Sequence, residues 1–186
     1  MTPSSEDVDV SVPVPGAGGS RRVVGIGEFA ISRGGTDVIV THALGSCVAV
    51  CLWDPVAEVA GLLHVLLPDS RISPQRAAEQ PAAFADTGMP LLFRAAYALG
   101  AEKRRLRVSL VGGGESPCGE RGETQPFSIG RRNVLAIKNV LWRNGVLVSA
   151  EDVGGTAVRT VYLAGADGRI VVAVGDRRVM LRGRRP

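Results

Sequence analysis

Cys47 and His64, seventeen residues apart, are the residues of this chain best suited to nucleophilic chemistry. Each lies in an apolar run, and Asp54-Pro55 between them predicts a turn, because proline fixes φ and has no N–H for a ladder. A β-hairpin folded between residues 55 and 56 places Cys47 directly opposite His64, with Cβ atoms about 4.5–5.5 Å apart. A thiol and an imidazole so placed can exchange a proton, whereas a slip of one residue separates them onto opposite faces.

A cysteine acts as a nucleophile only when a neighbouring group raises its thiolate fraction, and His64 can do this. The imidazole in turn needs a group that fixes its tautomer. Thr41, at the end of the preceding strand, is expected to be that group, with His42 as a weaker candidate. Gly45 and Ser46 allow an unusual backbone turn and leave room for a substrate beside the sulfur. On these residues alone, simple packing of Cys47 and His64 in a core remains the alternative.

The remaining cysteines and glycines suggest no cofactor. Cys51 shares a strand face with Cys47 about 13 Å away and is expected to pack, and Cys118 has no evident partner. No Cys-x-x-Cys pair exists, so the sequence predicts no metal site. The glycines at 25–27 and 112–114 lack the residues that complete a dinucleotide or phosphate loop, and they predict bulges or tight turns, with possible space beside an active site at 112–114.

Composition narrows the class of protein. The chain has 186 residues, 45% of them hydrophobic, and 24 glycines, which suits a turn-rich mixed fold. An aromatic content of 4% argues against stacking platforms for nucleic acid. No apolar stretch approaches the ~20 residues that cross a bilayer, so no membrane insertion is expected. No secretion signal opens the chain, and three cysteines without a disulfide pattern favour a reducing cytoplasm.

The chain is predicted to contain one domain between two tails. Residues 1–21 are expected to be a disordered N-terminal tail, 22–182 a single domain, and 183–186 a basic C-terminal tail. Five of the last ten residues are arginines. They predict a solvated terminus, with an acidic protein, nucleic acid or an anionic membrane surface as alternative contacts.

Hydrophobic periodicity predicts an α+β fold. Two helices are expected, at about 85–99 and 131–143, with a polar linker at 69–80 and an irregular stretch at 115–128. Outside the Cys47/His64 hairpin, strands are expected near 23–30, 37–41, 105–111, 146–152, 158–164, 169–175 and 178–182. Most loops between strands are too short for helical crossovers. The sheets should therefore be largely antiparallel, with the helices packed outside, rather than one doubly wound parallel sheet.

Several segments, in order along the chain, resemble the chemoreceptor glutamine deamidase (CheD) family of bacterial chemotaxis. The most specific is Leu44-Gly45-Ser46-Cys47-Val48, followed by His64 and by Leu67-Pro68-Asp69-Ser70. The other matching segments are Gly25-Ile26-Gly27-Glu28, Phe84-Ala85-Asp86, Gly112-Gly113, Ile129-Gly130-Arg131-Arg132-Asn133 and Glu151-Asp152-Val153-Gly154-Gly155 with Arg159. The chain departs from the family pattern after the glycines, at about 115–128.

The resemblance implies a cytoplasmic cysteine hydrolase that needs no cofactor and no metal. Cys47 would be the nucleophile, His64 the general base and acid, and Thr41 the third member, with backbone N–H groups near Gly45 and Ser46 serving the substrate oxyanion. The implied substrates are glutamines of methyl-accepting chemoreceptors, and a CheC-type phosphatase is a possible partner. The implied fold is a sandwich shared with bacterial toxin deamidases. The alternatives are a chemoreceptor or phosphatase adaptor with a vestigial site and, less well supported, a thiol-redox or protease-like enzyme.

Overall fold

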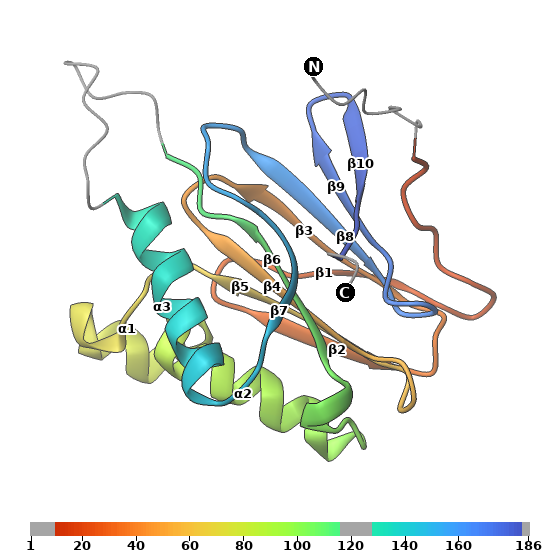
Figure 1. Ribbon diagram of the computed structural model, residues 1–186, viewed down its shortest axis with the longest axis horizontal. Coiled ribbons are helices and arrows are strands. Elements are labelled where there is room, and N and C mark those ends of the chain that lie inside the picture. Colours follow the sequence, from red (N-terminus) through yellow and green to blue (C-terminus); the bar gives the residue numbers. More distant parts are fainter. Residues whose placement is uncertain (1–9, 116–127, 184–186) are drawn as a thin grey trace.

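Two five-stranded sheets lie face to face, and the helices cover the far side of one of them (Figure 1). The computed structural model describes residues 10–115 and 128–183. The strands in this part are β1 (Arg21–Val23), β2 (Phe29–Arg33), β3 (Val38–Leu44), β4 (Val48–Asp54), β5 (Val59–Val65), β6 (Arg107–Gly112), β7 (Val148–Val153), β8 (Arg159–Ala164), β9 (Ile170–Val174) and β10 (Arg177–Leu181). The α-helices are α1 (Pro74–Glu79), α2 (Ala85–Ala98) and α3 (Ile129–Arg143), with short 3₁₀ turns at Ser70–Ile72, Pro81–Ala83 and Lys103–Arg105.

The outer sheet has the order β1-β3-β8-β9-β10 and the central sheet the order β2-β5-β4-β6-β7. Only the β1/β3 and β6/β7 pairs are parallel among the described strands. The central sheet is therefore the middle layer, between the outer sheet and helices α2 and α3 (Figure 1). This arrangement confirms the predicted α+β sandwich with largely antiparallel sheets and helices outside.

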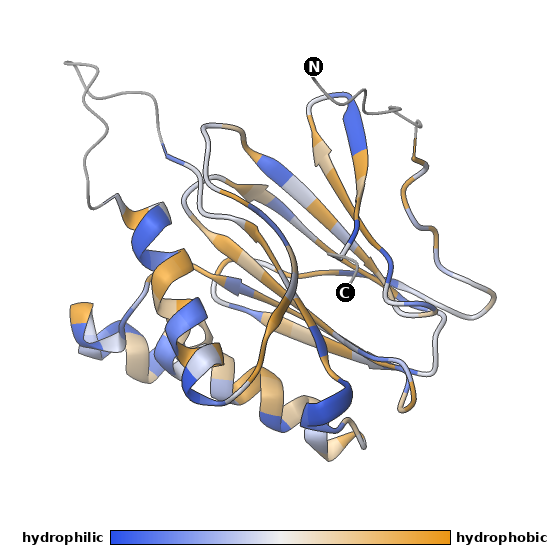
Figure 2. Ribbon diagram, in the orientation of Figure 1, coloured by the Kyte–Doolittle hydropathy of each residue, from blue (hydrophilic) through white to orange (hydrophobic). Residues whose placement is uncertain are grey.

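The middle layer is apolar on both faces, so the fold has two cores. Along β4 the side chains of Val48, Val50 and Leu52 pack against α2 and α3, while Ala49 and Cys51 pack against the outer sheet. Figure 2 shows hydrophobic residues dominating the strands of the central sheet and alternating with hydrophilic residues along α2 and α3. This pattern is typical of a doubly covered sheet and of helices with one buried face.

The hairpin of β4 and β5 forms as predicted, but its register differs from the prediction by two residues. Asp54 pairs with Val59 and Ala49 with His64, so residues 55–58 form a four-residue loop. The buried Asp54 carboxylate accepts the backbone N–H groups of Val56 and Ala57, and Glu58 adopts a left-handed φ of 52°. The centre of the hairpin therefore lies between residues 56 and 57, and not between 55 and 56 as the sequence predicted.

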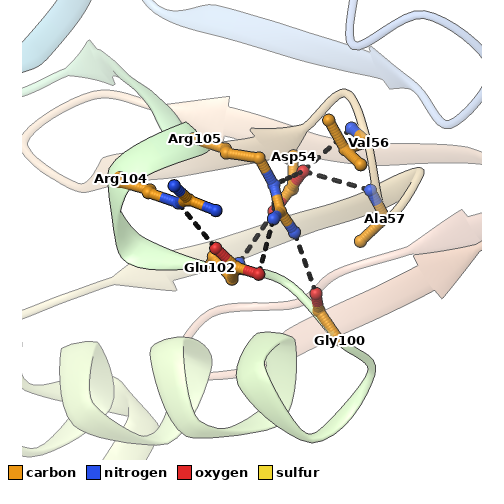
Figure 3. A network of polar contacts seen from close by, with 7 residues as sticks. All are labelled: Asp54, Val56, Ala57, Gly100, Glu102, Arg104 and Arg105. Carbon is orange, nitrogen blue, oxygen red and sulfur yellow. Dashed lines mark hydrogen bonds and ion pairs between the residues drawn. The ribbon is translucent and has the colours of Figure 1, made fainter.

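A network of polar contacts anchors that turn to the rest of the domain (Figure 3). Asp54 also accepts the N–H of Glu102 at 2.8 Å and forms an ion pair with Arg105, whose Nη2 lies 3.0 Å from Oδ2. Burial by itself raises the pKa of the Asp54 carboxyl, but the hydrogen bonds from Arg105 and the three backbone N–H groups outweigh it and hold that pKa well below its usual range. The turn is thus held by residues about fifty positions away in the sequence.

Most predicted elements are present, with two differences. The stretch 23–30 is not one strand: β1 ends at Val23 in the outer sheet and β2 begins at Phe29 in the central sheet. The predicted linker 69–80 contains the short helix α1, which buries no residue and so has no apolar stripe to find. Residues 1–9, 116–127 and 184–186, including Cys118, lie outside the described residues, and the division into tails and domain stays a prediction.

Candidate active site

The chain passes from the outer to the central sheet through Gly45, Ser46 and Cys47. Just before this crossing, the register of β3 against β8 shifts between Thr41 and Leu44, and Ala43 has a φ of 58°. Such a bulge bends a strand, and bulges are common beside active sites. Here the bend directs the chain out of β3 and delivers Cys47 to the first position before β4, at the end of the space between the two sheets.

Thr41, which the sequence predicts as the group that orients His64, contacts it across the two sheets. Its Oγ1 lies 2.7 Å from His64 Nδ1 and also donates a hydrogen bond to the carbonyl of Val24 at 2.8 Å. A hydroxyl has one proton to donate, and the carbonyl can only accept it. Thr41 Oγ1 therefore accepts from Nδ1–H, which leaves the lone pair of the ring on Nε2.

His64 is held tightly and is almost fully buried. Its backbone N–H donates to the carbonyl of Glu28 and its carbonyl accepts from the N–H of Gly27, so the ladder continues past the end of β2. Burial lowers the pKa of His64 to about 4. The ring is therefore neutral at physiological pH, and its buried Nε2 has no hydrogen-bond partner in the described part of the chain. A neutral imidazole with a free Nε2 is suited to accept a proton.

Cys47 lies on the same face of the central sheet as His64. Because Ala49 is the residue directly opposite His64, Cys47 is a diagonal neighbour, and such Cβ atoms are about 7–8 Å apart or somewhat less. The predicted direct opposition is therefore wrong, although the shared face is retained because the register changed by an even number. Among the described residues no hydrogen bond links the thiol to Nε2.

The thiol is nearly buried beside an exposed residue. Cys47 is 7% exposed, whereas Ser46 next to it is on the surface. Burial raises the pKa of the Cys47 thiol, and a hydrogen bond from its own backbone N–H opposes this shift. Thiol and imidazole thus rest as a neutral pair rather than as a thiolate and an imidazolium. Such a pair can react by transferring the thiol proton to Nε2 as the sulfur attacks.

The sequence predicts bulges or tight turns at the glycines 112–114, with possible space beside an active site, and it assigns no role to Asn133 within the family-like segment 129–133. Gly112 has a φ of 114°, and a Cβ there would lie 2.3 Å from the carbonyl oxygen of Cys47. These glycines let β6 approach the Cys47 loop closely, rather than leaving empty space beside it. Asn133 is fully buried in α3 and donates to the carbonyl of Ser46. Asn133 and Ile137 are four residues apart, so both lie on the buried face of α3. An amide at such a position can be recognised from the sequence as a candidate functional residue.

Other candidate residues lie elsewhere. His42 points away from His64: it is exposed on the outer sheet, with its ring against Tyr162 and its Nδ1 3.4 Å from Thr160 Oγ1. The prediction that it could orient His64 is therefore wrong, because neighbouring residues of a strand face opposite sides. Cys51 packs in the core between the sheets, as predicted, and burial raises its pKa to about 12.

The polar residues after β5 act locally. Asp69 caps the 3₁₀ turn that follows it, and Ser70 donates to the Asp86 carboxylate through both its N–H and its hydroxyl. In residues 10–115 and 128–183, no three His, Cys, Asp or Glu side chains cluster in a way that could hold a metal ion. None of the helices in these ranges is long and apolar enough to cross a membrane.

Comparison with known proteins gives consistent matches over most of the chain. A family model described as CheD chemotactic sensory transduction matches residues 66–174, a range that begins just after His64. The chain is 49% identical over 154 residues to the probable chemoreceptor glutamine deamidase CheD 2 of Anaeromyxobacter dehalogenans, covering 83% of this chain and 94% of that protein. It is 42% identical to the probable chemoreceptor glutamine deamidase CheD 1 of Syntrophus aciditrophicus, covering 81% and 91%. It is 39% identical to the chemoreceptor glutamine deamidase CheD of Thermotoga maritima, covering 82% and 90%.

Proposed function

The chain belongs to the CheD family of chemotactic sensory transduction proteins, and on this premise we propose that it is a chemoreceptor glutamine deamidase. It is a cytoplasmic hydrolase that converts glutamine side chains of methyl-accepting chemoreceptors to glutamate and releases ammonia. The observation that carries the proposal is the 2.7 Å contact between Thr41 and His64, which leaves Nε2 unprotonated on the face that also bears Cys47. The printed names of the relatives supply the substrate class.

The reaction begins from the neutral pair. As Cys47 Sγ attacks the side-chain amide carbon of the glutamine, its proton moves to His64 Nε2. Thr41 Oγ1 accepts from Nδ1–H and stabilises the imidazolium that forms. The amide oxygen becomes an oxyanion that accepts hydrogen bonds from the N–H groups of Ser46 and Cys47.

The second half of the reaction returns the site to its starting state. His64 Nε2–H protonates the leaving nitrogen, so ammonia departs and a thioester joins the substrate to Cys47. Water then attacks the thioester and gives its proton to Nε2. The thiolate that leaves recovers this proton, and the product carries a glutamate.

The burial of the site fits a substrate with a long, unbranched side chain. Cys47 and His64 are 7% and 1% exposed, whereas the neighbouring Ser46 is at the surface. A glutamine can extend its terminal amide from the surface at Ser46 toward the sulfur while the helix that carries it stays outside. The dry surroundings also strengthen the hydrogen bonds that stabilise charge in the transition state.

The test is an incubation of the full chain with the cytoplasmic fragment of a chemoreceptor, followed by mass spectrometry of receptor peptides. We expect glutamines to gain the small mass that distinguishes an acid from an amide, and we expect Cys47→Ala to abolish this conversion while receptor binding remains. Cys51→Ala is the matched control, because Cys51 lies on the same strand face but packs in the core.

Other outcomes would identify the alternatives. Binding without conversion by the intact protein would favour the adaptor, and peptide-bond cleavage would favour a protease. A CheC-type phosphatase partner stays a prediction that a binding measurement with the purified proteins can test.

A further inference from the structure

All three carbonyl groups of the crossing between the sheets are bound by residues from elsewhere in the fold. The carbonyl of Gly45 accepts the N–H of Gly114 and that of Cys47 accepts the N–H of Gly113, both at 2.7 Å. The carbonyl of Ser46, between them, accepts a hydrogen bond from Asn133 Nδ2 at 3.0 Å. In contrast, the N–H groups of Ser46 and Cys47 donate to no backbone carbonyl in the described part of the chain.

The bound carbonyl groups also fix the directions of the Ser46 and Cys47 N–H groups. A peptide group is planar and trans, so its C=O and the N–H that follows point in opposite directions. The bond from Gly114 to the carbonyl of Gly45 therefore fixes the direction of the Ser46 N–H. The bond from Asn133 to the carbonyl of Ser46 fixes the direction of the Cys47 N–H in the same way. The Cys47 N–H belongs to the residue that carries the reacting sulfur, so this donor is next to the reacting atom in the chain.

The Asn133 amide group ties two parts of the site together. The same Nδ2 that binds Ser46 donates to the carbonyl of Leu66 at 2.9 Å. Leu66 follows His64 by two residues, so one NH₂ group joins the Cys47 loop to the end of the strand that carries the imidazole. The orientation of the amide is unambiguous, because the reverse would place Oδ1 against two carbonyl oxygens.

The Oδ1 atom of Asn133 is buried and does not stabilise the fold through a hydrogen bond to any described residue. Asn133 is 0% exposed, and its Oδ1 has no hydrogen-bond partner among the described residues. A buried polar group without a partner costs stability, so an apolar side chain would suit the packing of α3 at least as well. The use of asparagine here is explained by the two hydrogen bonds that its Nδ2 donates.

We propose that Asn133 is a positioning residue that orients the backbone N–H of Cys47 as an oxyanion donor and sets the spacing between the Cys47 loop and the His64 strand. It touches neither the substrate nor the sulfur, and acts through the Ser46–Cys47 peptide group. Gly114 has the corresponding effect on the N–H of Ser46 through its backbone. The inference rests on the proposed deamidation, because an oxyanion forms only if the thiol attacks an amide.

The test compares Asn133→Leu with Ile137→Ala in the receptor-fragment assay. Leucine has the branched shape of asparagine but is larger and has no donor, so it keeps water out of the place of Nδ2. Removal of one oxyanion donor typically lowers kcat by about 10²- to 10³-fold. Because the variant misdirects the Cys47 N–H but does not remove it, we expect kcat to fall by about 10- to 100-fold, with KM little changed. Ile137→Ala is the control, because Ile137 lies one turn further along the same buried face of α3 and its apolar side chain can donate no hydrogen bond to the loop.

A second measurement separates loss of the oxyanion donor from general damage. A receptor peptide in which an aldehyde replaces the glutamine amide forms a hemithioacetal with Cys47, and its oxygen occupies the oxyanion position. Asn133→Leu should weaken binding of this aldehyde by about the same factor as kcat, while binding of the unreactive glutamine peptide to a Cys47→Ala background stays the same. If Asn133→Leu does not fold, Asn133→Ala is measured instead.

The outcomes distinguish this inference from the proposed function. Unchanged kcat and aldehyde affinity in a folded Asn133 variant would overturn the role of Asn133 while leaving the deamidase intact. An equal loss in Ile137→Ala would reduce Asn133 to a packing residue and also overturn the inference. No conversion by the unmodified protein would reject the proposed function itself.

Discussion

Replacement of Thr41 by valine is the most direct perturbation of the proposed chemistry. Valine keeps the shape of threonine but has no hydroxyl, so Nδ1–H of His64 loses its acceptor. Thr41 and His64 are 0% and 1% exposed, and therefore water has little access to replace the lost partner. The variant should keep the fold, which circular dichroism can check, and lose the group that stabilises the imidazolium.

The magnitude follows from the charge that His64 acquires in the transition state. A hydrogen bond to a charged group contributes about 1.5–3 kcal/mol, and 1.36 kcal/mol corresponds to a tenfold change in rate, so kcat should fall about 10- to 150-fold. Nitrogen-15 chemical shifts of the His64 ring should also change, from the Nδ1–H tautomer to a mixture. The assay is the conversion of receptor glutamine measured by mass spectrometry.

The control for this experiment is Thr160→Val. Thr160 also places its hydroxyl near a histidine, His42, but at 3.4 Å and on the outer sheet away from the site. We expect this variant to behave like the unmodified protein. An unchanged kcat in a folded Thr41→Val protein, with the His64 tautomer preserved, would refute the assignment of Thr41 as the group that orients the imidazole.

Three further predictions concern pH and stability. The pKa of His64 is about 4 in the folded protein and 6.5 ordinarily, so between these pH values the unfolded chain binds a proton that the folded chain does not. The free energy of unfolding should therefore keep its full value above pH 6.5 and fall by roughly 3 kcal/mol as the pH approaches 4. Urea unfolding at several pH values should show a shallower fall in His64→Gln, and equal slopes in the two proteins would contradict the burial argument. Burial raises the pKa of the Cys47 thiol, so its alkylation by iodoacetamide should still accelerate above the ordinary thiol pKa of about 8.5. Peptide mass spectrometry can follow this reaction, and a plateau near neutral pH would indicate a preformed thiolate. Asp54→Ala leaves Arg105 without its buried partner and should lower the free energy of unfolding by about 3–5 kcal/mol. The control Lys138→Ala breaks an exposed pair with Glu151 and should change this free energy by less than about 1 kcal/mol. Similar losses for both variants in urea unfolding would show that the Asp54 network is not structural.

The periodicity of the sequence was sufficient to predict most of the fold. Strand alternation and helical stripes located β3 to β10, α2 and α3, because each of these elements buries one or two faces in a regular pattern. A hairpin loop with an even number of residues places Cys47 and His64 on one face, and the observed loop of four residues meets this condition. The short helix α1 was missed because it has no buried side.

The tertiary structure decided which contacts form between the layers and between segments that are distant in the sequence. The register of the β4/β5 hairpin depends on a turn held by Glu102 and Arg105, which lie about fifty residues from Asp54 and follow no local rule of turn chemistry. The hydrogen bond from His64 to Thr41 exists because the two sheets stack, and the bonds from Asn133 exist because α3 packs on the end of the central sheet. Local periodicity determines which face of an element is buried, and only the packing of the elements against one another determines which atoms then meet.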